Sequence, residues 1–134
     1  MKQGKPTRSE KRKYVRLQPK EAISVHFKIV TKSEGEKVPI HHRAKTKNVS
    51  GGGMFLEIPL LEPKLLEGVL RGTHNLFLEI NIPTSSYLVK ALAKVVWIEG
   101  KTSKQYGVGV SFLSINEEDR DKLMEYIIEG CLQE

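Results

Sequence analysis

Two arginines near the start of the chain have the chemistry and the spacing to bind a planar anion. Arg12 and Arg16 lie four residues apart. A guanidinium is planar and permanently charged, so it can donate two parallel hydrogen bonds to a phosphate, stack on a base, or bind the O6/N7 edge of guanine. Arg8 and Arg12 have the same spacing, but Arg12 and Arg16 are preferred because Leu17 and the first strand follow them shortly afterwards.

A second candidate segment runs Asn48-Val49-Ser50-Gly51-Gly52-Gly53. Asn and Gly tolerate left-handed backbone conformations, and such a turn can direct several N–H groups into one anion-binding concavity. The glycines also leave room for a flat base to approach the backbone. A plain β-turn or bulge between two strands is the simpler alternative. The segment is not a P-loop, because no Gly-Lys-Ser/Thr follows it.

The two motifs taken together resemble the PilZ domain family. Arg12 and Arg16 match the arginine pair of that family, and Asn48, Ser50 and Gly53 match its Asp/Asn-x-Ser-x2-Gly motif about 30 residues further on. The segments 93–97 and 106–112 are also similar to late strands of the family. The resemblance covers roughly residues 10–130.

The resemblance implies a small six-stranded antiparallel β-barrel with a C-terminal helix, all-β apart from that helix, which binds cyclic di-GMP without catalysis or cofactor. In the family's terms Arg12 and Arg16 hold guanine and phosphate. Asn48 and Ser50 hydrogen-bond the second guanine or a phosphate, and Gly53 shapes the turn.

Four further residues are secondary candidates for the same ligand: Arg8, Lys11, Gly51 and Gly52. Lys11 precedes the arginine pair, a position that the resemblance associates with the choice between one ligand and a stacked pair. The residues here leave that choice open.

The positive charge of the chain is concentrated at its N-terminus. Residues 1–20 hold eight Lys or Arg and one Glu, whereas the remainder carries a net charge of −1. We therefore expect a flexible basic arm over residues 1–11, followed by one barrel domain over 12–134. Such an arm suits an anionic partner: a nucleotide, a nucleic acid or a membrane surface. A solvated tail that keeps the protein soluble is the simpler alternative.

Composition narrows the class of protein. A single cysteine excludes an internal disulfide and suits a reducing compartment, and no apolar run reaches the ~18 residues of a membrane span. The first residues also lack the apolar core of a signal peptide. We expect a cytoplasmic protein that does not insert into membranes.

Hydrophobic periodicity places the elements. Ile23, Val25, Phe27 and Ile29 alternate with polar residues, which is typical of a half-buried strand. Six strands are expected, over Ala22–Thr31, Val38–Asn48, Met54–Ile58, Asn75–Ile82, Tyr87–Glu99 and Tyr106–Leu113. Pro59–Gly72 contains two prolines and two glycines and is expected to be a loop with room for one helical turn.

One helix is predicted over residues 116–130. Asn116 is a good N-cap, three acidic residues follow it, and Gly130 suits a left-handed C-terminal cap. The apolar stripe of this helix comprises Leu123, Tyr126, Ile127 and Cys131, and it needs a surface on which to pack.

Other chemistry finds little support. No Ser-His-Asp or Cys-His arrangement is present, and the four histidines lack zinc spacing, so neither an enzyme nor a metal site is expected. Trp97 is assigned to the core or the barrel rim, with stacking on a ligand base as the alternative.

Two rival functions stay open. One is a PilZ-like interaction module without ligand, and the other is a nucleic-acid-binding barrel, which the lack of interleaved exposed aromatics disfavours. With no second domain expected, the signal must pass to a separate, unidentified protein.

Overall fold

Seven strands and two helices make up the described part of the chain, which in this computed structural model is residues 16–19, 22–31, 41–59, 61–100 and 105–132. The strands are β1 (Arg16–Leu17), β2 (Ile23–Thr31), β3 (His41–Ser50), β4 (Gly53–Pro59), β5 (His74–Ile82), β6 (Tyr87–Gly100) and β7 (Gln105–Ile115). The helices are α2 (Pro63–Arg71) and α3 (Glu117–Leu132).

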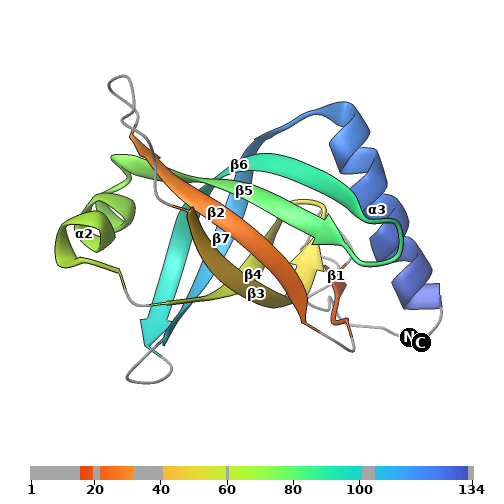
Figure 1. Ribbon diagram of the computed structural model, residues 1–134, viewed down its shortest axis with the longest axis horizontal. Coiled ribbons are helices and arrows are strands. Elements are labelled where there is room, and N and C mark those ends of the chain that lie inside the picture. Colours follow the sequence, from red (N-terminus) through yellow and green to blue (C-terminus); the bar gives the residue numbers. More distant parts are fainter. Residues whose placement is uncertain (1–15, 20–21, 32–40, 60, 101–104, 133–134) are drawn as a thin grey trace, which may run out of the picture.

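Six of the strands close into an antiparallel barrel (Figure 1). Their order is β3-β2-β5-β6-β7-β4, and β4 pairs back with β3. Closure leaves no long unpaired strand edge. The short strand β1 pairs with Val49 and Ser50 at the end of β3, beyond the last residue that β2 covers. The predicted barrel is confirmed.

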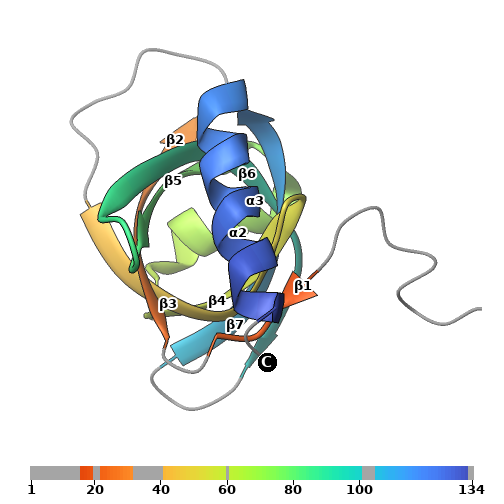
Figure 2. The same ribbon diagram turned by 90° about the vertical axis from the view of Figure 1, so that its right-hand side faces the viewer.

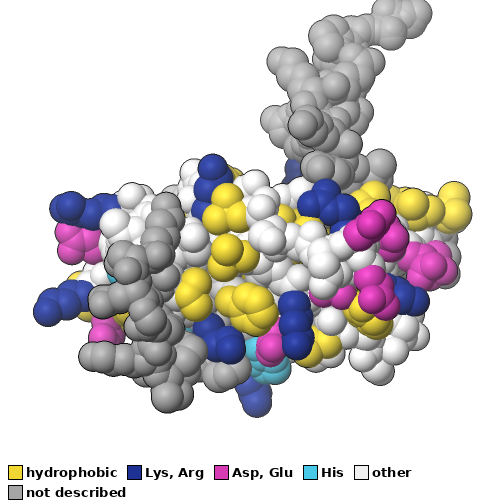
Figure 3. Space-filling model, turned by 90° about the horizontal axis from the view of Figure 1, so that it is seen from above, with side chains coloured by type: hydrophobic (Ala, Val, Ile, Leu, Met, Phe, Trp, Pro, Cys, Tyr) yellow, Lys and Arg dark blue, Asp and Glu magenta, His cyan; other side chains and the backbone are white. Residues whose placement is uncertain are grey.

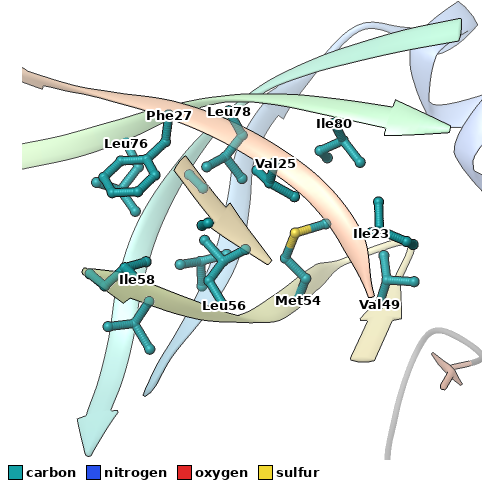
Figure 4. Close-up of a cluster of buried hydrophobic side chains, with 14 of the residues drawn as sticks. Ile23, Val25, Phe27, Val49, Met54, Leu56, Ile58, Leu76, Leu78 and Ile80 are labelled. Carbon is teal, nitrogen blue, oxygen red and sulfur yellow. The ribbon is translucent and has the colours of Figure 1, made fainter. Parts of the chain in front are cut away.

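Alternate residues of each strand fill the barrel (Figure 4). Ile23, Val25 and Leu78 are fully buried, and Phe27 is nearly so. Each large aliphatic side chain removed from water in this way contributes roughly 1.5–3 kcal/mol. The period-two pattern of β2 therefore reflects one face in the core and one in solvent.

A helix covers each end of the barrel. In Figure 2, which looks along the barrel, α3 crosses the near opening and α2 lies at the far one. Leu123 and Ile127 of α3 and Val69 of α2 are buried in the common core. The helix stripe predicted for residues 116–130 thus packs on the barrel. Neither helix of the described chain is long and apolar enough to cross a membrane.

The prediction of a loop over Pro59–Gly72 is wrong, because residues Pro63–Arg71 form α2. Pro63 stands in the first turn, where its missing N–H removes no helical hydrogen bond. Gly72 adopts φ 84° as the C-cap, and its N–H donates to Val69. Proline and glycine here mark the two ends of a helix rather than a loop.

The C-terminal helix is confirmed, but its end is not the predicted one. Asn116 caps α3, since its Oδ1 accepts a hydrogen bond from the N–H of Asp119 at 2.8 Å. The helix then continues past Gly130 to Leu132. A Cβ at Gly130 would lie 2.7 Å from Leu17, so this glycine allows α3 to approach β1 closely and is not a C-cap.

Candidate ligand-binding face

The glycine-rich segment forms a tight hairpin corner. β3 ends at Ser50, Gly51 and Gly52 make the turn, and β4 begins at Gly53, which pairs with Ser50. The Ser50 hydroxyl donates to the Gly53 carbonyl at 3.3 Å and accepts from the Gly52 N–H at 3.2 Å. The hydroxyl is therefore engaged in holding the turn together. β3 itself runs over His41–Ser50 rather than Val38–Asn48, and residues 38–40 lie outside the described chain.

Gly53 is required for space rather than for an unusual backbone angle. A Cβ at this position would collide with the carbonyl oxygen of Val110 in β7. Among the glycines of the described segments only Gly72 has a positive φ. The absence of a side chain at Gly53 therefore lets β4 lie directly against β7, where Gly53 pairs with Ser111.

A bulge in β3 turns the motif side chains outward. Ala44 and Thr46 point into the core, and the β3–β4 register then shifts between Thr46 and Asn48. Because one extra residue reverses the alternation, Val49 becomes buried while Asn48 and Ser50 face outward. The buried Thr46 hydroxyl stabilises the bulge by accepting from the Asn48 N–H at 3.2 Å and donating to the Asn48 carbonyl at 3.0 Å.

Arg16 meets the second motif directly. Its Nε donates a hydrogen bond to Oδ1 of Asn48 at 2.9 Å, across 32 positions of sequence. Pairing of Arg16 with Ser50 in the β1–β3 ladder positions the exposed guanidinium there. One half of the arginine pair and the Asn-x-Ser-x2-Gly motif thus form a single surface. Arg12, Arg8 and Lys11 lie outside the described residues.

Helix α3 supports β1 from behind. The Cys131 thiol lies 3.6 Å from the Arg16 carbonyl, in hydrogen-bonding geometry, and Gly130 faces Leu17. At its other end the helix is fixed to β6 by the buried carboxylate of Asp119. That carboxylate accepts hydrogen bonds from the Tyr87 hydroxyl at 2.8 Å and from the Lys90 N–H at 3.0 Å.

The bond to Asp119 also changes the acidity of Tyr87. It is the largest cause, followed by desolvation, of a rise in the Tyr87 pKa from 10.0 to about 12. A carboxylate acceptor favours the protonated phenol that donates to it. Burial alone raises the pKa of a second tyrosine, Tyr126 of α3.

Strand register places further outward residues beside the motif. A first row across β1, β3, β4, β7 and β6, here called the polar row, consists of Arg16, Ser50, Gly53, Ser111 and Lys94. A second row beside it, the aromatic row, consists of Asn48, Phe55, Gly109 and Trp97. The polar row has a cation at each end and small residues between them.

The aromatic row is built on a glycine. The Trp97 and Phe55 rings stack with centroids 5.3 Å apart and 28° between their planes. A Cβ at Gly109 would collide with the Trp97 indole, so glycine allows the indole to lie over β7. Trp97 keeps 49% of its surface exposed and belongs to the outer wall of the barrel rather than to its core. The indole can therefore offer a flat surface to a base.

A metal site would need several ligating side chains grouped together. Within the described segments no three His, Cys, Asp or Glu side chains are grouped to hold a metal ion. His42 instead stacks on Phe27, with ring centroids 5.0 Å apart.

Comparison with known proteins supports the family that the motifs suggest. A family model described as the PilZ domain matches residues 10–129. The chain belongs to the PilZ domain family. No curated protein sequence matches it.

Three solved structures are similar to this fold at low sequence identity. The structure of the Bacillus subtilis inhibitor of motility (MotI/DgrA) is 20% identical, with a TM-score of 0.65 over 96% of this chain and 57% of that one. The PilZ domain of Escherichia coli YcgR with c-di-GMP is 13% identical, with a TM-score of 0.58 over 92% and 93% of the two chains. YcgR in complex with c-di-GMP is 14% identical, with a TM-score of 0.57 over 92% and 47%. The chain thus spans little more than half of MotI and about half of YcgR.

Sequence reasoning missed three residues of this PilZ face. Lys94, Ser111 and Phe55 were not singled out, because each lies within an ordinary strand. The signal that identifies them is their register opposite the motif residues, which appears only once the strand order is known.

Proposed function

We propose that this PilZ domain is a non-enzymatic receptor for cyclic di-GMP, held on the outer barrel face across the polar and aromatic rows. The observation that carries the proposal is the 2.9 Å bond between Arg16 and Asn48, because it joins the arginine motif and the glycine-rich motif into one surface. The ligand offers two phosphates and two guanines, which are the groups that guanidiniums bind best.

The polar row supplies the charge for the two phosphates. Arg16 binds a phosphate or the guanine edge at one end, and Lys94 attracts the second phosphate from the other. Gly53 and Ser111 lie between them in the row and leave room for the sugar-phosphate ring. Each charge-assisted hydrogen bond contributes roughly 1.5–3 kcal/mol.

The aromatic row supplies the contact for a base. Asn48 donates and accepts through its amide, and Trp97 stacks on guanine through its exposed surface. Stacking of a base on an aromatic side chain contributes roughly 1–3 kcal/mol. Together the two rows recognise the phosphate charges, the hydrogen-bonding edge of guanine and its flat ring. Inorganic phosphate offers only the charge, so the face should discriminate a cyclic dinucleotide from it.

Within the proposal the N-terminal segment completes the site. Arg12, four residues before Arg16, binds the opposite side of the ligand, and Arg8 and Lys11 add to the attraction. Bringing this segment over the ligand alters the surface that a partner protein meets, which is the form of many binding switches.

A chemical-shift titration of the full chain with cyclic di-GMP tests the proposal. We expect saturable shifts at Arg16, Asn48 and Gly53 and in the Trp97 indole N–H. Excess single-stranded RNA should leave these shifts unchanged. Displacement by RNA would favour a nucleic-acid-binding barrel, and no shifts at excess ligand would favour an interaction module without ligand.

A further inference from the structure

Helix α3 carries a second apolar stripe, which packs on the core at half-buried Met124 and leaves the barrel toward the C-terminal end of the helix. Leu123 and Ile127 are fully buried against the strands. Met124, Ile128 and Leu132 follow at a spacing of four and lie one position further around the helix. Ile128 is 49% and Leu132 81% exposed, so the stripe emerges into solvent toward the last turn.

The stripe is bordered by negative charge. α3 contains six acidic and two basic residues, and five of the acidic residues are exposed: Glu117, Glu118, Asp121, Glu125 and Glu129. In Figure 3 hydrophobic and acidic side chains gather at the right-hand end of the molecule, where Figure 1 places α3. The helix is acidic in a chain whose net charge is +6.

We infer that this face of α3, with Met124, Ile128 and Leu132 inside an acidic border, docks a basic amphipathic helix of a partner protein. Apolar anchors at helical spacing would pack on the stripe, and Lys or Arg beside them would face the carboxylates. Charge complementarity selects this partner over a second copy of α3, because two acidic faces would repel.

The helix that carries the docking face contacts β1, the strand that carries Arg16 of the ligand-binding face. The last turn of α3 contacts β1 through Cys131 at the Arg16 carbonyl and through Gly130 at Leu17. Leu132 follows Cys131 directly. A ligand that holds Arg16 would therefore act on the turn in which the stripe ends. This coupling rests on the proposed function, whereas the docking face does not.

A synthetic 14-residue peptide of Leu and Lys at helical spacing is a suitable probe. Its affinity for the full chain, without nucleotide, is measured by fluorescence anisotropy, and its contacts are mapped by chemical shifts. We expect shifts on α3, and binding at least tenfold weaker for the Ile128→Ser/Leu132→Ser variant. A peptide with Ser in place of Leu should bind at least tenfold more weakly than the original.

Leu70→Ser is the matched control, because Leu70 is a 52% exposed helical residue at the opposite end of the barrel. It should leave peptide affinity unchanged. Shifts confined to the barrel wall, or equal losses in both variants, would overturn the inference. So would a dimer in light scattering that Ile128→Ser dissociates, since a second copy would then occupy the face.

Cyclic di-GMP is then added to the peptide titration. We expect a change of at least threefold in peptide affinity, absent in Arg16→Ala. Ligand binding without this change would overturn only the coupling. A failure of cyclic di-GMP to bind at all would overturn the proposed function and leave the nucleotide-free docking result standing.

Discussion

Ser50 and Gly53 hold the hairpin corner together, whereas Arg16 and Asn48 present polar groups on the exposed face, although all four belong to the same pair of motifs. The Ser50 hydroxyl is engaged with the backbone of Gly52 and Gly53, and Gly53 lies against the Val110 carbonyl. Arg16 and Asn48 bond each other on the exposed side of the barrel. A motif residue can thus support binding either by shaping the corner or by contacting the ligand.

The distinction changes how a loss of binding should be interpreted. We call a residue that shapes the corner a framework residue. Its substitution should reduce binding because the corner loses its shape, so stability should fall as well. Substitution of a residue that contacts only the ligand should reduce binding while the free energy of unfolding stays the same. Measuring both quantities for each variant separates the two kinds of residue.

Gly53→Ala should have the largest effect, because its Cβ would meet the Val110 backbone and force β4 from β7. Overpacking of this kind costs typically 1–3 kcal/mol, and we expect the upper half of that range here, with cyclic di-GMP binding lost as well. Urea unfolding measures the cost. Gly100→Ala is the control, since nothing lies within 4 Å of a Cβ at Gly100. Equal stability of the two variants would contradict the role of Gly53 in spacing the strands.

Arg16→Ala should weaken cyclic di-GMP binding by a factor of ten or more, because it removes a charge-assisted contact of roughly 1.5–3 kcal/mol. Its unfolding free energy should change little, since the guanidinium is exposed. Arg43→Ala, at an exposed arginine near the start of β3, is the control and should bind normally. Calorimetric titration measures the affinities. Full affinity of Arg16→Ala would remove this residue from the site.

Ser50→Ala should cost about 1 kcal/mol of stability, because the turn loses a donor and an acceptor. We expect less than a threefold change in affinity for cyclic di-GMP, which would place Ser50 in the framework. Ser114→Ala, at an exposed serine of β7, provides the comparison. A tenfold loss of affinity at unchanged stability would instead make Ser50 a ligand contact.

Features that depend on local sequence signals could be predicted from the sequence. Alternation in β2 and the cap at Asn116 are local signals, so they predict the existence of the six barrel strands and the start of α3. The composition of Pro59–Gly72 predicts a loop instead of α2, because proline and glycine at the two ends of a helix give the same signal as they do inside a loop.

The outward orientation of Asn48 illustrates what the sequence could not give. It depends on a bulge, and that bulge is held by the buried hydroxyl of Thr46, a residue without a motif of its own. Gly130 likewise looked like a helix end, and only the approach of Leu17 explains why glycine stands inside α3. Both features are set by contacts between distant segments, which composition and periodicity do not record.

The smallest effect is expected at Tyr87 in β6, whose hydroxyl donates a hydrogen bond to Asp119 in the first turn of α3. Its pKa is raised from 10.0 to about 12 in the folded chain, so folding favours the protonated phenol. The resulting stability is complete below pH 10 and is lost as the pH rises from 10 to 12. Tyr87→Phe should therefore reduce the fall in unfolding free energy across that interval, measured by urea unfolding at pH 9, 10 and 11. Part of the fall should persist, because burial also raises the pKa of Tyr126, and Tyr126→Phe should remove that part. If Tyr87→Phe kept the full pH dependence, the bond from Tyr87 to Asp119 would not be what raises this pKa, and the Lys90 N–H would be left as the bond that fixes the start of α3 to β6.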